Sequence, residues 1–184
     1  MLVLLVSEKI PRPPVMFPLI VVVMITRLVE ERGRKKADRY WPEMRGQELE
    51  LENGMTVRLL TDRPVRNKPE IRTRSIKLSL HGRVLVVSRL KFFHHNNAGE
   101  IKTVQQLHCE GWTDQEVPRD TKLMLNLQDE AEYNLAKMPE AAMLVHCSAG
   151  MGRTGAFIGL FKLIRDFRNR KVRQVTTYKN NHGS

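Results

Sequence analysis

The chain has 184 residues, of which 41% are hydrophobic and 28% are charged. This balance excludes a disordered or fibrous protein, and the length allows one ordinary domain with a core but not two large ones. The formal net charge of +11 favours anionic partners, such as phosphorylated peptides, nucleic acids or membrane surfaces, without choosing among them. Two cysteines, Cys109 and Cys147, are too few for a disulfide framework, which indicates a reducing compartment.

Two apolar runs near the amino terminus, MLVLLV and VMFPLIVVVMI, are six and eleven residues long. A membrane-spanning helix needs about 20 apolar residues, so we predict no membrane span. Met1 is followed directly by leucine, without the positive flank of a signal peptide. The β-branched residues of the second run predict a buried strand over residues 19–26, whereas residues 1–18, with four prolines, are not assigned.

Two hairpins are predicted beyond this strand. Asn53 and Gly54 lie between two runs of alternating polarity, and both residues accept the positive φ of a tight turn. A second alternation over residues 76–80 is followed by His81-Gly82-Arg83 and an apolar return over residues 84–93. We therefore expect antiparallel strands in this part of the chain.

The second half of the chain predicts two helices with a short strand between them. Apolar residues from Met124 to Met138 recur at helical spacing, with Asp120 as the N-cap. Residues 143–145 form a short apolar run typical of a buried strand, and apolar residues from Phe157 to Phe167 define a helix that begins near Arg153. The predicted fold class is α/β, a mixed twisted sheet flanked by helices.

Residues 146–155 read HCSAGMGRTG and place Cys147 and Arg153 at the junction of that strand and that helix, with five residues between them. Backbone N–H groups at a helix N-terminus bind anions, and small side chains leave these groups accessible. The predicted cradle for a tetrahedral oxyanion comprises Ser148, Ala149, Gly150, Met151, Gly152 and Arg153.

The same loop predicts nucleophilic chemistry. The positive field lowers the pKa of Cys147, and the thiolate is the form that attacks phosphorus. Arg153 can bind two phosphate oxygens, and Thr154 can donate its hydroxyl to the sulfur when the sulfur leaves. The alternative is a structural cysteine beside a packed helix start, which accounts for Cys147 but not for its combination with Arg153 and Thr154.

The ten residues resemble the signature of the protein tyrosine phosphatases, with matches at His146, Cys147, Gly150, Gly152, Arg153, Thr154 and Gly155. The resemblance implies a strand-to-helix phosphate-binding loop and hydrolysis of phosphotyrosine in proteins through a phosphocysteine intermediate. It implies no cofactor, no metal and no nucleic-acid partner. It assigns catalytic roles to His146, Cys147, Arg153 and Thr154.

A second stretch, HCEGWTDQEVP at residues 108–118, is similar to the mobile acid loop of this family, which reads Trp-Pro-Asp. The resemblance implies that Asp114 is the general acid and that Trp112 supports it. Such an acid is needed because a tyrosine phenolate, with a pKa of about 10, leaves poorly without a proton. Thr113 and Glu116 stand where the family has proline and glycine. Without the signature, Asp114 is more typical of a turn or a helix cap than of a general acid.

A third stretch, VEERGRKKADRYWPE at residues 29–43, is similar to a family segment that reads Lys-Cys-x-x-Tyr-Trp-Pro, with Ala37 in place of the cysteine. The resemblance implies that Glu31 supports the arginine and that Lys36 supports the acid loop. From composition alone, residues 30–36 are equally typical of an exposed charged turn. Tyr40 and Trp41 are expected to be core aromatics.

The resemblance divides the chain into an unassigned segment (1–18), an incomplete phosphatase-like domain (19–172) and a frayed tail (173–184). The family's pocket-wall loop and its water-positioning glutamine loop have no recognisable counterparts. Three hypotheses follow: a cytoplasmic protein tyrosine phosphatase, a phosphopeptide-binding pseudo-phosphatase with little turnover, and an inactive fragment. Phosphate release, phosphopeptide binding and cooperative unfolding distinguish them.

Overall fold

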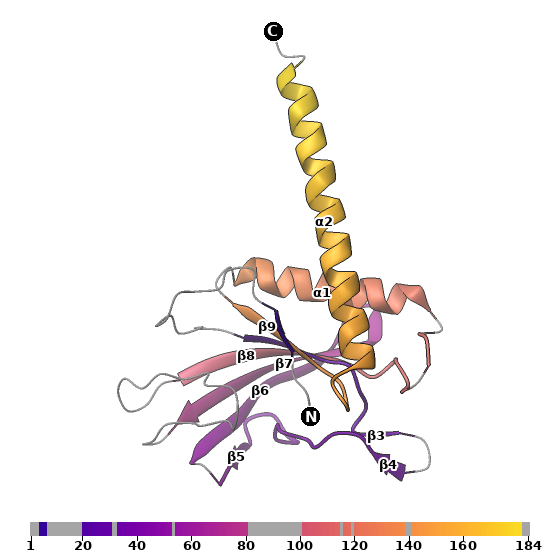
Figure 1. The fold of residues 1–184 in the computed structure, drawn as a ribbon. Helices are drawn as coiled ribbons and strands as arrows, with labels where there is room; N and C mark the ends of the chain where they lie inside the picture. Colours follow the sequence, from indigo (N-terminus) through magenta and orange to yellow (C-terminus); the bar gives the residue numbers. More distant parts are fainter. Residues whose placement is uncertain are drawn as a thin grey trace.

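The computed structural model describes residues 4–6, 20–30, 33–52, 54–80, 101–114, 116–118, 120–138 and 141–181. Within these ranges a seven-stranded mixed sheet forms the centre of the molecule (Figure 1). The strands, in spatial order, are β1 (Leu4–Val6), β9 (Ala142–His146), β2 (Ile20–Met24), β8 (Ile101–Cys109), β7 (Lys68–Leu80), β6 (Met55–Val65) and β5 (Glu48–Glu50). A separate two-stranded sheet pairs β3 (Val29–Glu30) with β4 (Arg34–Lys35).

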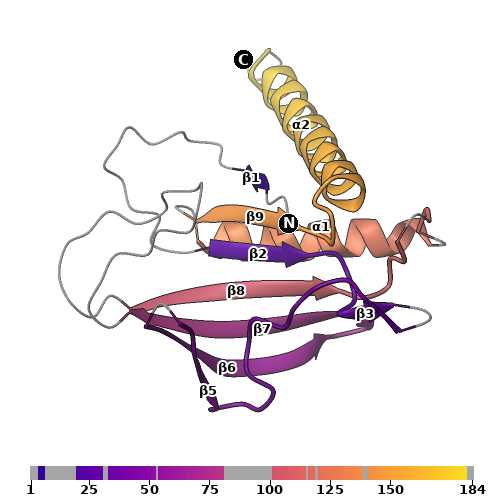
Figure 2. The same cartoon turned by 60° about the horizontal axis from the view of Figure 1, so that its bottom comes forward.

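Strand β2 lies at the centre of the sheet, between β8 and β9 and parallel to both (Figure 2). Its residues alternate between two cores: Val21 and Val23 belong to the cluster under the helices, and Val22 and Met24 to the cluster on the opposite face. A strand covered on both faces is apolar at successive positions. The strand predicted over residues 19–26 is therefore confirmed over Ile20–Met24, and Leu19 lies outside the described residues.

The other half of the sheet is antiparallel. Strands β5 and β6 form the predicted hairpin, in which Gly54 has φ +77° and Asn53 lies outside the described residues. Strands β6 and β7 form a further hairpin through Arg66 and Asn67, which the sequence analysis did not predict; Asn67 has φ +61°. Strand β7 ends at Leu80 and pairs with β8, whereas the predicted turn and return strand, residues 81–93, lie outside the described residues.

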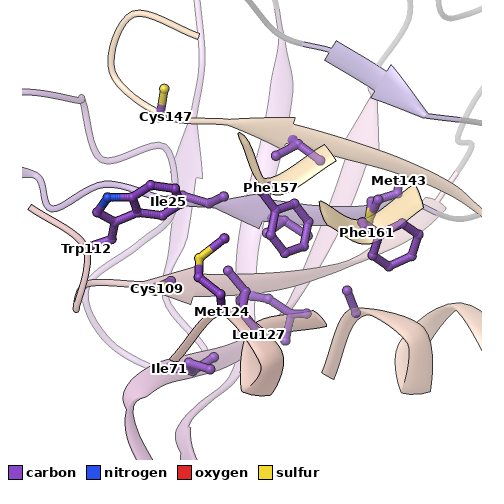
Figure 3. Close-up of a cluster of buried hydrophobic side chains, with 14 of the residues drawn as sticks. Ile25, Ile71, Cys109, Trp112, Met124, Leu127, Met143, Cys147, Phe157 and Phe161 are labelled. Carbon is purple, nitrogen blue, oxygen red and sulfur yellow. The ribbon is translucent and has the colours of Figure 1, made fainter. Parts of the chain in front are cut away.

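Two helices cover one face of the sheet. Helix α1 (Thr121–Lys137) begins after Asp120, whose side chain accepts a hydrogen bond from Lys122 N at 2.8 Å, so the predicted N-cap is confirmed. Helix α2 (Gly152–Asn181) packs Phe157 and Phe161 into the same core and then rises away from the sheet (Figures 1 and 3). Its backbone is helical to Asn181, which includes most of the tail that was expected to fray.

The topology brings three chain segments to one edge of the sheet. Strands β2, β8 and β9 run parallel, so their carboxyl ends meet there, and Met24 is in register with both His108 and His146. Residues 25–30, 110–114 and 147–153 follow these ends. Loops at the carboxyl ends of parallel strands are the usual place for a ligand site in α/β proteins.

The predicted fold class, α/β with a mixed sheet flanked by helices, is confirmed by this arrangement. Within the described ranges, neither helix has the length and apolar character that crossing a membrane requires. In the same ranges, no group of three or more His, Cys, Asp or Glu side chains is placed to hold a metal ion.

Candidate active site

The loop between β9 and α2 wraps around the thiol of Cys147. Gly150 has φ +77°, a conformation that glycine adopts without steric cost, and its N–H donates to Cys147 Sγ at 3.2 Å. Cys147 is 3% exposed and lies at the end of the core cluster (Figure 3). Ser148 is half-buried, and its hydroxyl donates to the backbone oxygen of Lys36 at 2.8 Å. On the outer side of the loop, the exposed residues are Ala149, Met151 and Gly152.

Opposing effects act on the Cys147 thiol. Burial by itself raises its pKa, because the thiolate loses hydration. The nearby Thr154 hydroxyl, the backbone N–H groups of Thr154 and Gly150 and the charge of Arg153 lower the pKa by more. The net pKa is below the ordinary value, so the loop stabilises the thiolate.

Arg153 is held at one of its terminal nitrogens. Its Nη1 donates to Glu30 Oε1 at 3.0 Å and to the Trp112 carbonyl at 2.9 Å. Its Nε has no hydrogen-bond partner in the described part of the chain, and its Nη2 lies 3.1 Å from Asp114 Oδ1 without hydrogen-bond geometry. The guanidinium is therefore fixed in orientation, and its Nε and Nη2 remain as donors for oxygen atoms of a ligand.

The acid loop brings Asp114 beside this arginine. Asp114 Oδ2 accepts from Lys36 Nζ at 2.5 Å, and the Asp114 side chain is 31% exposed. Trp112, which is buried, donates from Nε1 to the Glu116 carbonyl at 2.7 Å and so closes the turn that carries Asp114. The structure thus places Lys36, Trp112 and Asp114 together with Cys147 and Arg153, and these residues come from three separate stretches of sequence.

Among the described residues, the glutamate that pairs with Arg153 is Glu30, whereas the predicted Glu31 lies outside the described residues. Glu30 ends β3, where Val29 is exposed and the Glu30 side chain is 7% exposed. This short strand pairs with β4 alone and leaves too weak a sequence pattern to choose between the two glutamates.

Tyr40, which was expected from the sequence to be a core aromatic, also contacts the site through its hydroxyl. Its hydroxyl lies 3.0 Å from His146 Nε2, and His146 Nδ1 lies 3.3 Å from the carbonyl oxygen of Cys147. Burial lowers the pKa of His146, so the ring is neutral at pH 7. The histidine before the nucleophile therefore acts on the loop through its hydrogen bonds and not through a charge.

This fold and this site are typical of a phosphatase-type α/β domain. The thiol lies in the strand-to-helix loop, and the arginine beside it is held by a glutamate and faces the Asp114 carboxylate. The family model for the protein-tyrosine phosphatase domain matches residues 19–181, and this chain belongs to that family.

Relatives and a solved structure agree with this assignment. The chain is 31% identical to human receptor-type tyrosine-protein phosphatase eta over 155 residues, and 32% identical to Drosophila melanogaster tyrosine-protein phosphatase 99A over 156 residues. Each comparison covers 84% of this chain but only 10% and 11% of those relatives. The structure titled "PTPN18 in complex with HER2-pY1248 phosphor-peptides" aligns with a TM-score of 0.58 and 28% identity over 77% of this chain and 44% of that chain.

Proposed function

We propose that this chain hydrolyses phosphotyrosine in proteins through a phosphocysteine intermediate. The observation that carries the proposal is the arrangement of Cys147 and Arg153. The sulfur has a lowered pKa and accepts from Gly150 N, and the guanidinium keeps Nε and Nη2 without hydrogen-bond partners among the described residues. This combination suits a dianionic group that is attacked by sulfur.

In the first step, the Cys147 thiolate forms a bond to phosphorus while the bond from phosphorus to the tyrosine oxygen breaks. Arg153 and the N–H groups of residues 148–153 bind the three non-bridging oxygens, where negative charge is located. Asp114, in its protonated form, donates its proton to the departing phenolate oxygen.

In the second step, the Asp114 carboxylate accepts a proton from water as the water oxygen bonds to phosphorus and the sulfur–phosphorus bond breaks. The Thr154 hydroxyl, which has no hydrogen-bond partner among the described residues, donates to the leaving thiolate and lowers its basicity. Glu30 orients Arg153, Lys36 positions Asp114, and Trp112 holds both the arginine and the turn of the acid loop. His146 positions the start of the loop.

The proposed substrates are phosphotyrosine-containing proteins. The aligned solved structure is titled as a complex with phosphopeptides, and the +11 formal charge of the chain favours anionic substrates. A thiolate nucleophile requires reducing conditions, so we place the protein's activity in the cytoplasm. The chain spans about a tenth of the length of the curated relatives it matches, so this proposal concerns the described domain.

The test is phosphate release from a phosphotyrosine peptide by purified chain without added metal. We expect release by the unmodified protein and none by Cys147→Ser. The matched control is Cys109→Ala, because Cys109 is the other buried cysteine and belongs to the hydrophobic core. Release that survives in Cys147→Ser contradicts the mechanism.

A second candidate function is phosphopeptide binding with little turnover. Asp114 forms ion pairs with both Lys36 and Arg153, so both of its carboxylate oxygens are held by cationic side chains and not presented to a leaving group. Thr113 and Glu116 also replace the proline and glycine of the family's acid loop. Saturable binding of the phosphopeptide without phosphate release would support this function over the first.

A further inference from the structure

A chain of buried polar side chains leads from the middle of the sheet to the nucleophile loop. It begins at Arg74 on β7, which is 5% exposed. Arg74 Nη1 lies 3.0 Å from Gln106 Oε1 and 3.0 Å from His108 Nδ1, and both partners are on β8. A guanidinium has only donors, so both of these atoms must accept.

Two further contacts, with Asp62 and with Trp41, fix the position of the Arg74 side chain. Its Nε forms an ion pair with Asp62 Oδ2 at 3.0 Å, and its guanidinium lies over the Trp41 ring, 4.5 Å from the ring centroid. These contacts leave Nη1 directed at β8. Arg74 is therefore a fixed source of hydrogen-bond donors inside the sheet.

In the first branch of this hydrogen-bond network, Arg74 determines which group of each pair donates and which accepts. Because Gln106 Oε1 faces the guanidinium, Gln106 Nε2 faces Tyr40 and donates to its hydroxyl oxygen at 2.6 Å. The Tyr40 proton then has two acceptors in reach, His146 Nε2 at 3.0 Å and the Met24 thioether at 3.8 Å. The imidazole nitrogen is the stronger acceptor, so Tyr40 donates to His146.

This direction determines the tautomer of His146. When Nε2 accepts, the single proton of the neutral ring is on Nδ1, which donates to the carbonyl oxygen of Cys147 at 3.3 Å. In the other tautomer, the Nδ1 lone pair and the carbonyl oxygen would be two acceptors facing each other in a buried site. That arrangement is costly, and it would displace the start of the loop.

In the second branch, Arg74 again determines the tautomer, because its guanidinium can only donate and its partner atom must accept. His108 Nδ1 accepts from Arg74, so His108 Nε2 carries the proton and donates to the Thr26 carbonyl at 2.7 Å. Burial lowers the pKa of both histidines, in agreement with neutral rings. Both branches end on residues at the carboxyl ends of the parallel strands.

We propose that Arg74 is a positioning residue for the proposed phosphoryl transfer: through Gln106 and Tyr40 it selects the His146 tautomer that holds the Cys147 carbonyl. The inference concerns how the proposed function is achieved, but its central claim, the tautomer, does not require turnover. Among described groups, the charge that acts on Cys147 is that of Arg153, whereas Glu110, Arg74 and His146 act on His108, with Glu110 Oε1 3.4 Å from His108 Nδ1. Of these charged groups, Arg74→Met removes one, and Tyr40→Phe and Gln106→Glu leave all of them in place.

The direct test is nitrogen-15 NMR of protein labelled at histidine, which distinguishes a protonated Nδ1 from a protonated Nε2. We expect the Nδ1–H tautomer for His146 and the Nε2–H tautomer for His108. In Gln106→Glu the side chain keeps its size and its contact with Arg74 but cannot donate to Tyr40. We therefore expect His146 to shift to the Nε2–H tautomer or to a mixture.

The second readout is the pH dependence of Cys147 alkylation by iodoacetate. Loss of one hydrogen bond at the loop corresponds to an upward shift of the midpoint by about half to one pH unit. We expect this shift in Tyr40→Phe and Arg74→Met, and no shift in Arg58→Met, which removes an exposed arginine paired with Glu48 on the edge of the sheet. Tyr40→Phe carries no change of charge and separates the hydrogen-bond effect from the negative charge that Gln106→Glu introduces.

An Nε2–H tautomer of His146 in the unmodified protein would overturn the proposal. So would folded Gln106→Glu and Tyr40→Phe variants with unchanged tautomer and unchanged midpoint. If Arg74→Met does not fold, these two variants decide the question. If the unmodified protein shows the expected tautomers but releases no phosphate, the result contradicts the proposed function and still supports the role of Arg74 in selecting the His146 tautomer.

Discussion

Replacement of Glu30 by glutamine tests which carboxylate orients the arginine of the site. Glu30 Oε1 and Arg153 Nη1 are 3.0 Å apart, and the two side chains are 7% and 4% exposed. At an effective dielectric constant of about 20, unit charges at this distance attract by about 5 kcal/mol, much of which is offset by the loss of hydration. Glutamine keeps an acceptor oxygen but not the charge, so we expect a net loss of about 1.5–3 kcal/mol.

This loss corresponds to a fall of roughly 10- to 100-fold in kcat/KM for a phosphotyrosine peptide, since about 1.4 kcal/mol changes a rate tenfold. The assay is phosphate release under steady-state conditions, with thermal unfolding to confirm that the variant is folded. Glu48→Gln is the matched control, because the Glu48 carboxylate pairs with Arg58 on an exposed surface and lies in β5, far along the sheet from β9. A control of this kind is expected to leave kcat/KM unchanged.

The adjacent variant Glu31→Gln makes the test decisive. The resemblance to the family favoured Glu31, whereas the structure places Glu30 on the arginine. A large loss in Glu31→Gln with none in Glu30→Gln would refute the reasoning from the structure and restore the assignment from the sequence.

Three further predictions concern the acid, the thiols and the core. Asp114→Asn is expected to lower kcat by about 10²- to 10⁴-fold and to retain phosphopeptide binding, measured by single-turnover kinetics and calorimetry; an unchanged kcat would exclude Asp114 as the acid. Iodoacetate at pH 7 is expected to label Cys147, and the rate of this labelling is expected to fall as the pH drops through the lowered pKa of the thiol. Cys109 is expected to stay unlabelled, because burial raises the pKa of that thiol to about 11. Peptide mapping that finds label on Cys109 would contradict this. Phe157→Ala is expected to lower the free energy of unfolding by about 3–5 kcal/mol in a urea titration, because Phe157 is buried in the core. Leu163→Ala, which alters an exposed side chain of the same helix, is expected to change it only slightly. Equal losses of unfolding free energy in the two variants would contradict the placement of Phe157 in the core.

Local features of the chain were predictable from sequence because their partners are close in sequence. Cys147, Gly150 and Thr154 lie within eight residues, so the loop that lowers the thiol pKa is encoded in one stretch. The N-cap Asp120 bonds to a residue two positions away. Short-range geometry of this kind follows from residue type and spacing.

The long-range contacts were not predictable in the same way. Glu30 and Arg153 are 123 residues apart, and the pair forms only because β2 and β9 are adjacent and parallel. The turn at Arg66 and Asn67 was missed because only Asn67 is a residue type that readily accepts positive φ, and no glycine marks the turn. Tyr40 matched a core aromatic in every respect except the hydrogen bonds of its hydroxyl.

The sequence alone determined the α/β class, the position of the proposed oxyanion loop, and the residue types that make Cys147 a candidate nucleophile and Asp114 a candidate acid. The tertiary structure decided which glutamate holds Arg153, and that Tyr40, Gln106 and Arg74 form a line toward His146. The physical reason is that residue types set which hydrogen bonds and charges are available. Strand order and register set which of them come within about 3 Å of one another.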